Sequence, residues 1–232
     1  MKVLILGIGN ILWADEGFGI RALETLNQEY SFDENVTLLD GGTQGVYLLH
    51  HVQECDILVV FDAVDYGLPS GELKLVHDED VPKFMGAKKV SLHQTGFQEV
   101  LALADLTGQY PEKIFLIGVQ PALLDDFGGS LTEGVKAQIQ PAIEQCLVYL
   151  EGHNITATKR DTPLEPSSRI NAETINMKDY EEQRPSNETA LRQGDDRVIF
   201  NNSFEQRDES LEPDSDCNVG VFIDGRKHFE DR

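Results

Sequence analysis

The chain has 232 residues, enough for one large domain or for one domain with an extension. Its 41 acidic and 19 basic side chains give a formal net charge of -22, which argues against binding to nucleic acid or to an anionic membrane, since phosphates would be repelled. No apolar run reaches the length of a membrane span, and the chain opens with a strand-like run instead of a signal peptide. We therefore expect a cytoplasmic protein.

Three cysteines, Cys55, Cys146 and Cys217, are far apart in the sequence and form no Cys-x-x-Cys pair. A sparse, odd set of cysteines in a cytoplasmic chain is typical of unpaired thiols that pack in the core. A redox or metal role is the alternative.

The opening residues predict a strand, a turn and a helix. Residues 3–6 are continuously apolar, as in a strand buried on both faces, and the turn residues 7–10 end them. A helix is expected over residues 18–29, and two adjacent acids, Asp15 and Glu16, precede it. Acids are favoured at a helix start, so Asp15 is interpreted as an N-cap. One cap needs only one of the two acids.

The Gly7-x-Gly9 turn after a first strand also suggests a dinucleotide-binding site. That motif requires a third glycine three residues later, where this chain has Leu12. Asp40, at the end of the second strand, stands where such folds place a ribose-binding acid. Glu16 would lie near the pyrophosphate with the wrong charge, so the nucleotide site is kept only as an alternative.

Strand and helix patterns alternate through residue 153, which indicates βα units around a mostly parallel sheet. The next expected elements are a strand over residues 36–39, a helix over 46–52, a central strand over 56–63 and an edge strand over 72–76. No helix separates the last two strands, so the edge strand is expected to be antiparallel.

The second half of this region carries two Thr/Ser-x-x-Gln/Glu capping boxes, at residues 95–98 and 130–133, each expected to open a helix. His93 would then lie on the loop before the first of these helices. A buried strand is expected over residues 114–119 between them. Pro141 falls within the last helix and is expected to kink it.

The composition changes after residue 153. Residues 154–232 contain 18 acids and 11 bases with few apolar clusters, which contributes -7 to the net charge and leaves -15 for residues 1–153. Such a segment buries too little surface to offset chain entropy. We expect a domain over residues 1–153 and an acidic, mostly disordered extension over 154–232 that is dispensable for activity.

Four polar residues are expected at the carboxyl ends of strands or the loops beside them: Glu16, Asp40, Asp62 and His93. Ligands of open α/β sheets gather at this edge. Two carboxylates and an imidazole suit a divalent metal such as nickel, zinc or manganese. Each residue alone has an ordinary structural explanation, as a helix-start charge, a turn cap or a local hydrogen bond.

Other hydrolase patterns are absent or weak. The sequence contains neither His-Glu-x-x-His nor Gly-x-Ser-x-Gly. Ser91, His93 and Asp62 could form a catalytic triad, but side chains so close on one extended segment rarely reach nucleophile and base geometry.

Together these residues resemble the hydrogenase maturation endopeptidases. The resemblance covers residues 1 to about 150, in the order and spacing of the family. Its motifs are Gly7-Ile8-Gly9-Asn10-Ile11-Leu12-x-x-Asp15-Glu16-Gly17-Phe18-Gly19, Asp40-Gly41-Gly42-Thr43, Asp62-Ala63, Ser91-Leu92-His93 and Ile117-Gly118-Val119-Gln120-Pro121.

The resemblance implies a three-layer α/β/α fold with a five-stranded twisted sheet, four strands parallel and one antiparallel. It implies an aspartic-type or metal-assisted endopeptidase that removes the C-terminal extension of a nickel-iron hydrogenase large-subunit precursor after nickel insertion. Glu16, Asp62 and His93 match the family's metal-binding residues, the nickel being that of the substrate. Asp40 is the candidate catalytic residue, and a monomer is expected. The alternative is a chaperone that binds the metal or the hydrogenase without cleaving it.

Overall fold

The computed structural model describes residues 1–85, 92–162, 164, 170 and 175–182, with the backbone alone at residues 83–85 and 92–95. All of these residues belong to one compact unit of the chain, Met1–Gln193. Within these ranges, no helix combines the length and the hydrophobicity needed to cross a membrane.

A five-stranded sheet forms the centre of the fold, in the order β3-β1-β4-β6-β5. Its strands are β1 (Val3–Ile8), β3 (Val36–Gly42), β4 (Ile57–Ala63), β5 (Leu73–His77) and β6 (Lys113–Val119). Only the edge strand β5 runs antiparallel to its neighbour. The prediction of four parallel strands and one antiparallel edge strand is confirmed, and β4 lies in the middle of the sheet, buried along its whole length.

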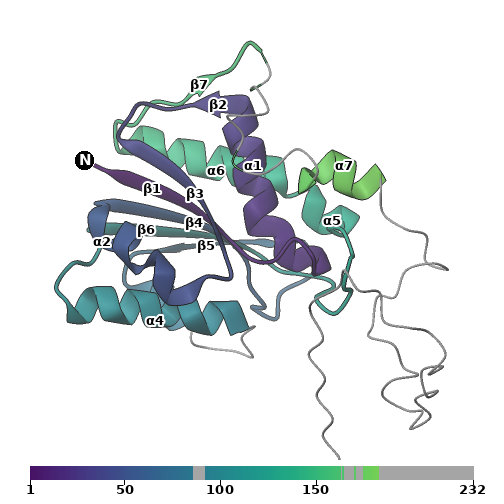
Figure 1. Cartoon of the computed structure of the whole chain (residues 1–232), viewed down its shortest axis with the longest axis horizontal. Coiled ribbons are helices and arrows are strands. Elements are labelled where there is room, and N and C mark those ends of the chain that lie inside the picture. Colours follow the sequence, from purple (N-terminus) through teal and green to yellow (C-terminus); the bar gives the residue numbers. More distant parts are fainter. Residues whose placement is uncertain (86–91, 163, 165–169, 171–174, 183–232) are drawn as a thin grey trace, which may run out of the picture. The chain divides into compact units, whose positions relative to one another are not determined.

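Helices cover both faces of the sheet (Figure 1). The first hydrophobic cluster joins alternate strand residues to α1 (Phe18–Glu29) and α6 (Ile139–Gly152). The second joins the remaining strand residues to α2 (Leu49–Glu54) and α4 (Leu92–Leu106). Because successive strand residues point to opposite faces, continuous apolar runs such as β4 supply both clusters. The expected three-layer architecture is confirmed.

Short elements connect these layers. They are η1 (Ala14–Gly17), η2 (Gly45–Leu48), α3 (Asp80–Met85), α5 (Glu133–Lys136), α7 (Met177–Glu182) and the antiparallel pair β2 (Tyr30–Ser31) and β7 (Thr158–Lys159). The sequence patterns did not predict α3, α7 or the β2–β7 pair, since elements of two to six residues show too few periods to detect.

Both capping-box predictions are wrong about where a helix begins. Helix α4 begins at Leu92, so His93 is its second residue and not part of a preceding loop. Helix α5 begins at Glu133 after Thr132, with no side-chain cap. The backbone N–H and the hydroxyl of Thr132 instead donate to the carboxylate of Asp15. Tertiary contacts therefore override the local capping pattern here.

Pro141 does not kink a helix interior, contrary to the prediction. The apolar pattern assigned to one long helix is divided between α5 and α6, and Pro141 is the third residue of α6. First-turn N–H groups have no partner within their own helix, so proline costs little there.

Several described residues beyond the predicted boundary at residue 153 pack on the sheet layers. Ile155 is buried in the first hydrophobic cluster, and Ile170 and Met177 pack against it. Strand β7 pairs with β2. These apolar residues are too widely spaced to produce a pattern, which explains why the sequence suggested disorder for them. Residues 154–232 also contain two short apolar runs, at 198–200 and 219–223, which lie outside the described residues.

The interpretation of the cysteines is confirmed for two of the three. Cys55 and Cys146 are buried and unpaired. Burial raises the pKa of the Cys55 thiol to about 12 and also raises the pKa of Cys146. Both are therefore protonated, unreactive packing groups at neutral pH. Cys217 lies outside the described residues.

Candidate functional site

The ends of the four parallel strands line up at the carboxyl edge of the sheet. Gly7 of β1 is in register with Asp40 of β3 on one side and with Phe61 of β4 on the other. Asp62 follows Phe61 directly and is in register with Gly118 of β6. Backbone pairing alone thus brings Asp40 and Asp62 to the same edge, on either side of β1.

Gly19 brings the start of α1 onto this edge. A Cβ atom at Gly19 would lie 2.2 Å from the carbonyl oxygen of Phe61 and 2.3 Å from that of Ile8. Only glycine permits this approach of a helix to two strand ends. In the dinucleotide motif, a third glycine at the position of Leu12 would allow the helix to pack closely on the strand. In this chain Gly19 has that packing role. As a result, η1, which carries Glu16, lies against β4 immediately before Asp62.

Asp15 is a structural residue, but it is not the predicted N-cap. The N-cap of α1 is Gly17, and Asp15 is fully buried within η1. Its carboxylate accepts hydrogen bonds from the backbone N–H groups of Ala122, Leu123 and Thr132 at 2.7–2.9 Å and from the Thr132 hydroxyl. Asp15 therefore fixes the loop between β6 and α5 against the loop between β1 and α1.

Glu16 follows Asp15 within the same 3-10 turn, but its side chain is only half-buried. The turn is reached through Ala14 at a φ of 41°, a left-handed conformation that a non-glycine residue adopts at a cost. The two adjacent acids thus have different environments. Asp15 is enclosed by backbone donors, whereas Glu16 lies at the accessible edge of the site.

Asp62 is fully buried at the end of β4. Its Oδ1 atom accepts the Ala63 N–H at 2.8 Å. Leu58 and Val60 belong to the second hydrophobic cluster, so strand alternation directs Asp62 toward the face that α4 covers.

Tyr66 lies beside Asp62, and the sequence analysis did not identify it. A Cβ atom at Gly118, the strand neighbour of Asp62, would lie 2.5 Å from the Tyr66 hydroxyl oxygen. Burial, and secondly the charge of Asp62, raise the pKa of Tyr66 well above its usual value. The phenol therefore remains protonated beside the carboxylate at neutral pH. Only three residues lie between the two in sequence, and no motif indicates the contact.

Asp40 approaches the edge from the other face. Val36 and Leu38 of β3 pack against the first cluster and Leu39 against the second, so alternation directs Asp40 toward the α1 face. The side chain is half-buried, and its Oδ1 atom accepts the Gly42 N–H at 2.8 Å. Asp40 thus stabilises the turn that leads from β3 to η2.

The backbone of His93 lies in the first turn of α4, which packs against η2. A Cβ atom at Gly96 would lie 3.2 Å from the Cα atom of Gly45. This places the start of α4 beside the loop that follows Asp40. The side chain of His93 and the whole of Ser91 lie outside the described residues. Among the side chains that the structure does describe, no three His, Cys, Asp or Glu residues form a metal-binding group.

Gln120 holds a second loop at this edge and was missed as a functional residue. Its Oε1 atom accepts the N–H groups of Tyr66 and Leu68, and its Nε2 atom donates to Asp65 at 3.0 Å. The amide thereby fastens the loop after β4 to the end of β6. In the sequence Gln120 appeared only within the family motif of residues 117–121, which gave it no role of its own.

Exposed apolar side chains border the site on the Glu16 side. Leu12 and Trp13 precede η1, and Leu123 and Phe127 lie on the loop that Asp15 fixes. The rings of Trp13 and Phe127 pack edge to face, with their centres 5.3 Å apart. We call Leu12, Trp13, Leu123 and Phe127 the apolar rim. Clusters of exposed large apolar groups next to a polar site indicate a macromolecular partner.

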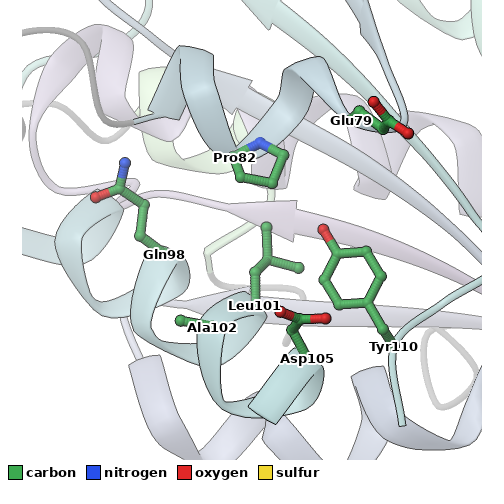
Figure 2. Close-up of a pocket in the computed structure, with 7 residues that line it drawn as sticks. All are labelled: Glu79, Pro82, Gln98, Leu101, Ala102, Asp105 and Tyr110. Atoms are coloured by element: carbon green, nitrogen blue, oxygen red, sulfur yellow. The ribbon is translucent and has the colours of Figure 1, made fainter. Parts of the chain in front are cut away.

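A pocket of about 590 Å³ lies elsewhere, between α3 and α4 (Figure 2). Glu79, just after β5, and Tyr110, just before β6, line it, which places it at the amino edge of the parallel strands. Burial, followed by the charges of Asp105 and Asp78, raises the pKa of Tyr110. None of the candidate residues at the carboxyl edge lines this pocket.

A family model described as hydrogenase maturation protease matches residues 20–148, more than half of the chain. The chain belongs to the hydrogenase maturation protease family. A hydrogenase expression/formation protein of Azotobacter chroococcum is 56% identical to this family member over 198 residues, covering 85% of this chain and 93% of the relative. Because the match exceeds 153 residues, it includes part of the C-terminal extension.

The hydrogenase 2 maturation protease of Escherichia coli is 40% identical over 162 residues, 69% of this chain and 98% of its own. The solved structure of a hydrogenase maturating endopeptidase from E. coli has a TM-score of 0.66 and 39% identity, covering 69% of this chain and 98% of that one. The fold and the assignment to the maturation endopeptidases, which are hydrolases, therefore agree with the resemblance in the sequence.

Proposed function

We propose that this family member removes the C-terminal extension from the large-subunit precursor of a nickel-iron hydrogenase after nickel has been inserted, and that it acts as a monomer in the cytoplasm. The observation that carries the proposal is the contact of Gly19 with Phe61 and Ile8, which places Glu16 and Asp62 at one edge of the sheet. Family membership supplies the reaction class.

The proposed roles follow from the chemistry of the side chains. Glu16 and Asp62 supply two oxygen donors, and His93, from the first turn of α4, supplies an imidazole nitrogen. This is a suitable ligand set for nickel, and it leaves coordination positions for groups of the substrate. The nickel belongs to the precursor, where it serves as Lewis acid and as the mark of a completed metal centre. The three residues then orient the precursor through that ion.

Asp40 is the proposed general base for the attacking water. Among the described residues, its Oδ1 atom accepts the Gly42 N–H, which leaves Oδ2 for another partner. Strand alternation directs it to the face opposite Asp62, so it is separate from the proposed ligands. A general base must come within hydrogen-bond reach of the water whose proton it takes, so Asp40 would approach that water from the α1 side.

The apolar rim is proposed to receive the polypeptide of the precursor. Tryptophan and phenylalanine are enriched in protein interfaces, and Trp13 lies three residues before Glu16. Contacts at the rim would hold the scissile segment beside the ion and would orient the scissile bond for attack.

The test is incubation of the purified chain with nickel-loaded and nickel-free precursor, followed by mass measurement of the large subunit. The proposal expects shortening of the nickel-loaded form alone. Asp62→Asn and His93→Ala should each reduce the rate by at least about 100-fold. The matched controls are Asp33→Asn and His50→Ala, at exposed positions away from the site, which should cleave normally.

The outcomes separate the candidate functions. Full processing by Asp62→Asn and His93→Ala rejects the ligand assignment. Binding of precursor without shortening of either form identifies a chaperone instead of a protease. For Asp40→Asn, we expect retained binding of nickel-loaded precursor with loss of cleavage; normal cleavage would reject the base assignment.

A further inference from the structure

Residues 175–182, which include α7, contact the elements on either side of the Glu16 loop. We call this segment the clasp. Figure 1 shows α7 beside α5, and Arg21 in the first turn of α1 contacts Ile175 and Tyr180. It belongs to the extension that the sequence analysis treated as dispensable, and each end of α7 has specific polar contacts with the first 153 residues.

Arg21 provides the first contact. It lies in the first turn of α1, four residues after Gly17, and only 3% of its surface is exposed. Its Nη1 atom donates to Glu24 Oε2 at 2.8 Å and to the backbone carbonyl of Ile175 at 2.6 Å. The guanidinium carbon lies 5.4 Å from the centre of the Tyr180 ring. A charge buried this deeply is stable only with such partners, and two of them come from the clasp.

Lys136 provides the second contact, from α5. Its Nζ atom donates to both carboxylate oxygens of Glu181, at 2.9 and 2.7 Å, and both side chains are about one-third exposed or less. Asn176 stabilises the start of α7, since its Oδ1 atom accepts the Asp179 N–H. Arg21 and Lys136 thus hold the segment from two different elements.

The clasp closes a small cavity against the Glu16 loop. Ile11, Ala14 and Gly17 line it from the loop, Leu131 lines it from the loop that Asp15 fixes, and Met177 and Tyr180 line it from the clasp. Ala14 and Gly17 immediately flank Asp15 and Glu16. The clasp therefore supports the outer side of η1, while Asp15 holds its inner side.

We propose that the clasp positions Glu16 for its role at the candidate site, with Lys136, Glu181 and Arg21 as positioning residues. The inference rests on the proposed function for its activity readout. The left-handed turn at Ala14 is a costly conformation, and surrounding contacts must maintain it. Without the clasp, one side of that turn loses its packing and Glu16 leaves the geometry that orients the precursor.

The experiment uses charge exchange in the full chain. Glu181→Lys removes the ion pair with Lys136 and places two like charges together; Lys136→Glu does the same from the other side. The double variant Lys136→Glu/Glu181→Lys restores an ion pair with reversed polarity. Glu182→Lys is the matched control, since it makes the same charge change one residue away, where Glu182 pairs with Lys178 on the exposed face of α7.

The first readout requires no activity. Trp13 is the only tryptophan of the chain and directly precedes η1. Its emission maximum and its quenching by acrylamide therefore report the conformation of the Glu16 loop. Both single variants at the ion pair should shift the emission and increase quenching. The double variant and Glu182→Lys should match the parent chain.

The second readout is cleavage of nickel-loaded precursor at a temperature where circular dichroism shows all variants folded. We expect KM to rise and kcat/KM to fall on the order of tenfold in Glu181→Lys and Lys136→Glu, with recovery in the double variant. A role in stability alone would lower the melting temperature but leave KM unchanged, which would overturn the proposal. Arg21→Lys, which keeps the charge but changes the donor geometry, should behave like the single variants.

The two proposals fail in different ways. Unchanged Trp13 emission in both single variants rejects the clasp, whatever the activity. A shifted emission that recovers in the double variant, in a chain that never shortens any precursor, supports the clasp as a support of the loop and rejects the proposed protease.

Discussion

The loops at residues 120–132 and 40–45 both leave the carboxyl edge of the sheet, but different interactions hold them in place. The first is fastened by polar side chains, since Asp15 accepts four hydrogen bonds from it and Gln120 binds a neighbouring loop. The second has one side-chain hydrogen bond, from the Gly42 N–H to Asp40, and otherwise depends on backbone conformation, with positive φ values at Gly42 and Gly45 and close packing against Gly96.

This difference predicts how each loop fails. A loop held by a buried carboxylate loses stability when the carboxylate is removed, because its donors are left buried without partners. A loop held by glycine conformations tolerates changes in side-chain chemistry but not an added Cβ atom. The two loops border the same candidate site, so stability and activity can be separated by changing one loop at a time.

Asp15→Ala should produce the largest effect. Three backbone N–H groups and a hydroxyl would lose their acceptor in a fully buried position. We expect the free energy of unfolding to fall by about 3 kcal/mol or more, measured by urea denaturation. Glu16→Gln, one residue away, should change it by less than about 1 kcal/mol. Equal losses in both variants would contradict the division of roles between the two acids.

Gly45→Ala tests the other loop. Its φ of 54° carries a penalty of about 1–2 kcal/mol for any residue with a Cβ atom. Gly108→Ala is the control, because it has a φ of 69° and no atom near the added Cβ. Both should lose similar thermal stability, but only Gly45→Ala should slow precursor cleavage, since Gly45 packs against Gly96 near the start of α4. A cleavage defect in Gly108→Ala would show that stability, not loop position, controls the rate.

The effect that is smallest at neutral pH, and appears only in alkali, concerns the core on the α4 face. The pKa of Cys55 is raised from 9.0 to about 12, so the unfolded state releases this proton first as the pH rises. The contribution of this thiol to the free energy of unfolding is fully present below about pH 9. It decreases between about pH 9 and 12, by up to about 1.4 kcal/mol per pH unit. Cys55→Ala should flatten the alkaline decline in unfolding free energy; an unchanged slope would show that the buried tyrosines dominate it.

Much of the fold was predictable because burial leaves a repeating pattern. The apolar run of β4, bracketed by Asp56 and Asp62, indicated the central strand, and the alternation in β5 indicated an edge. Helix starts were less predictable. Thr132 occupies the N-cap position of α5 but makes no side-chain cap, because its hydroxyl and its N–H both donate to Asp15, 117 residues away in sequence. No local pattern records such a contact.

The site was predictable only in part. Strand ends could be placed from the sequence, and with them Asp40 and Asp62. The burial of Asp15 and the partial exposure of Glu16 depend on which loop lies above each carboxylate. The support of η1 by the clasp depends on residues beyond position 153. Both arise from contacts between distant segments, so neither composition nor spacing indicates them.

The close approach of Gly19 to Ile8 and Phe61 has a mechanical consequence. Helix α1 cannot shift without moving the ends of β1 and β4, so Glu16 and Asp62 travel as parts of one rigid body. His93 is attached to a different layer, through α4 and its contact with Gly45. For the proposed ligand set, adjustment to the size of an ion would therefore come from movement of α4 along η2, while the two carboxylates keep their positions relative to each other.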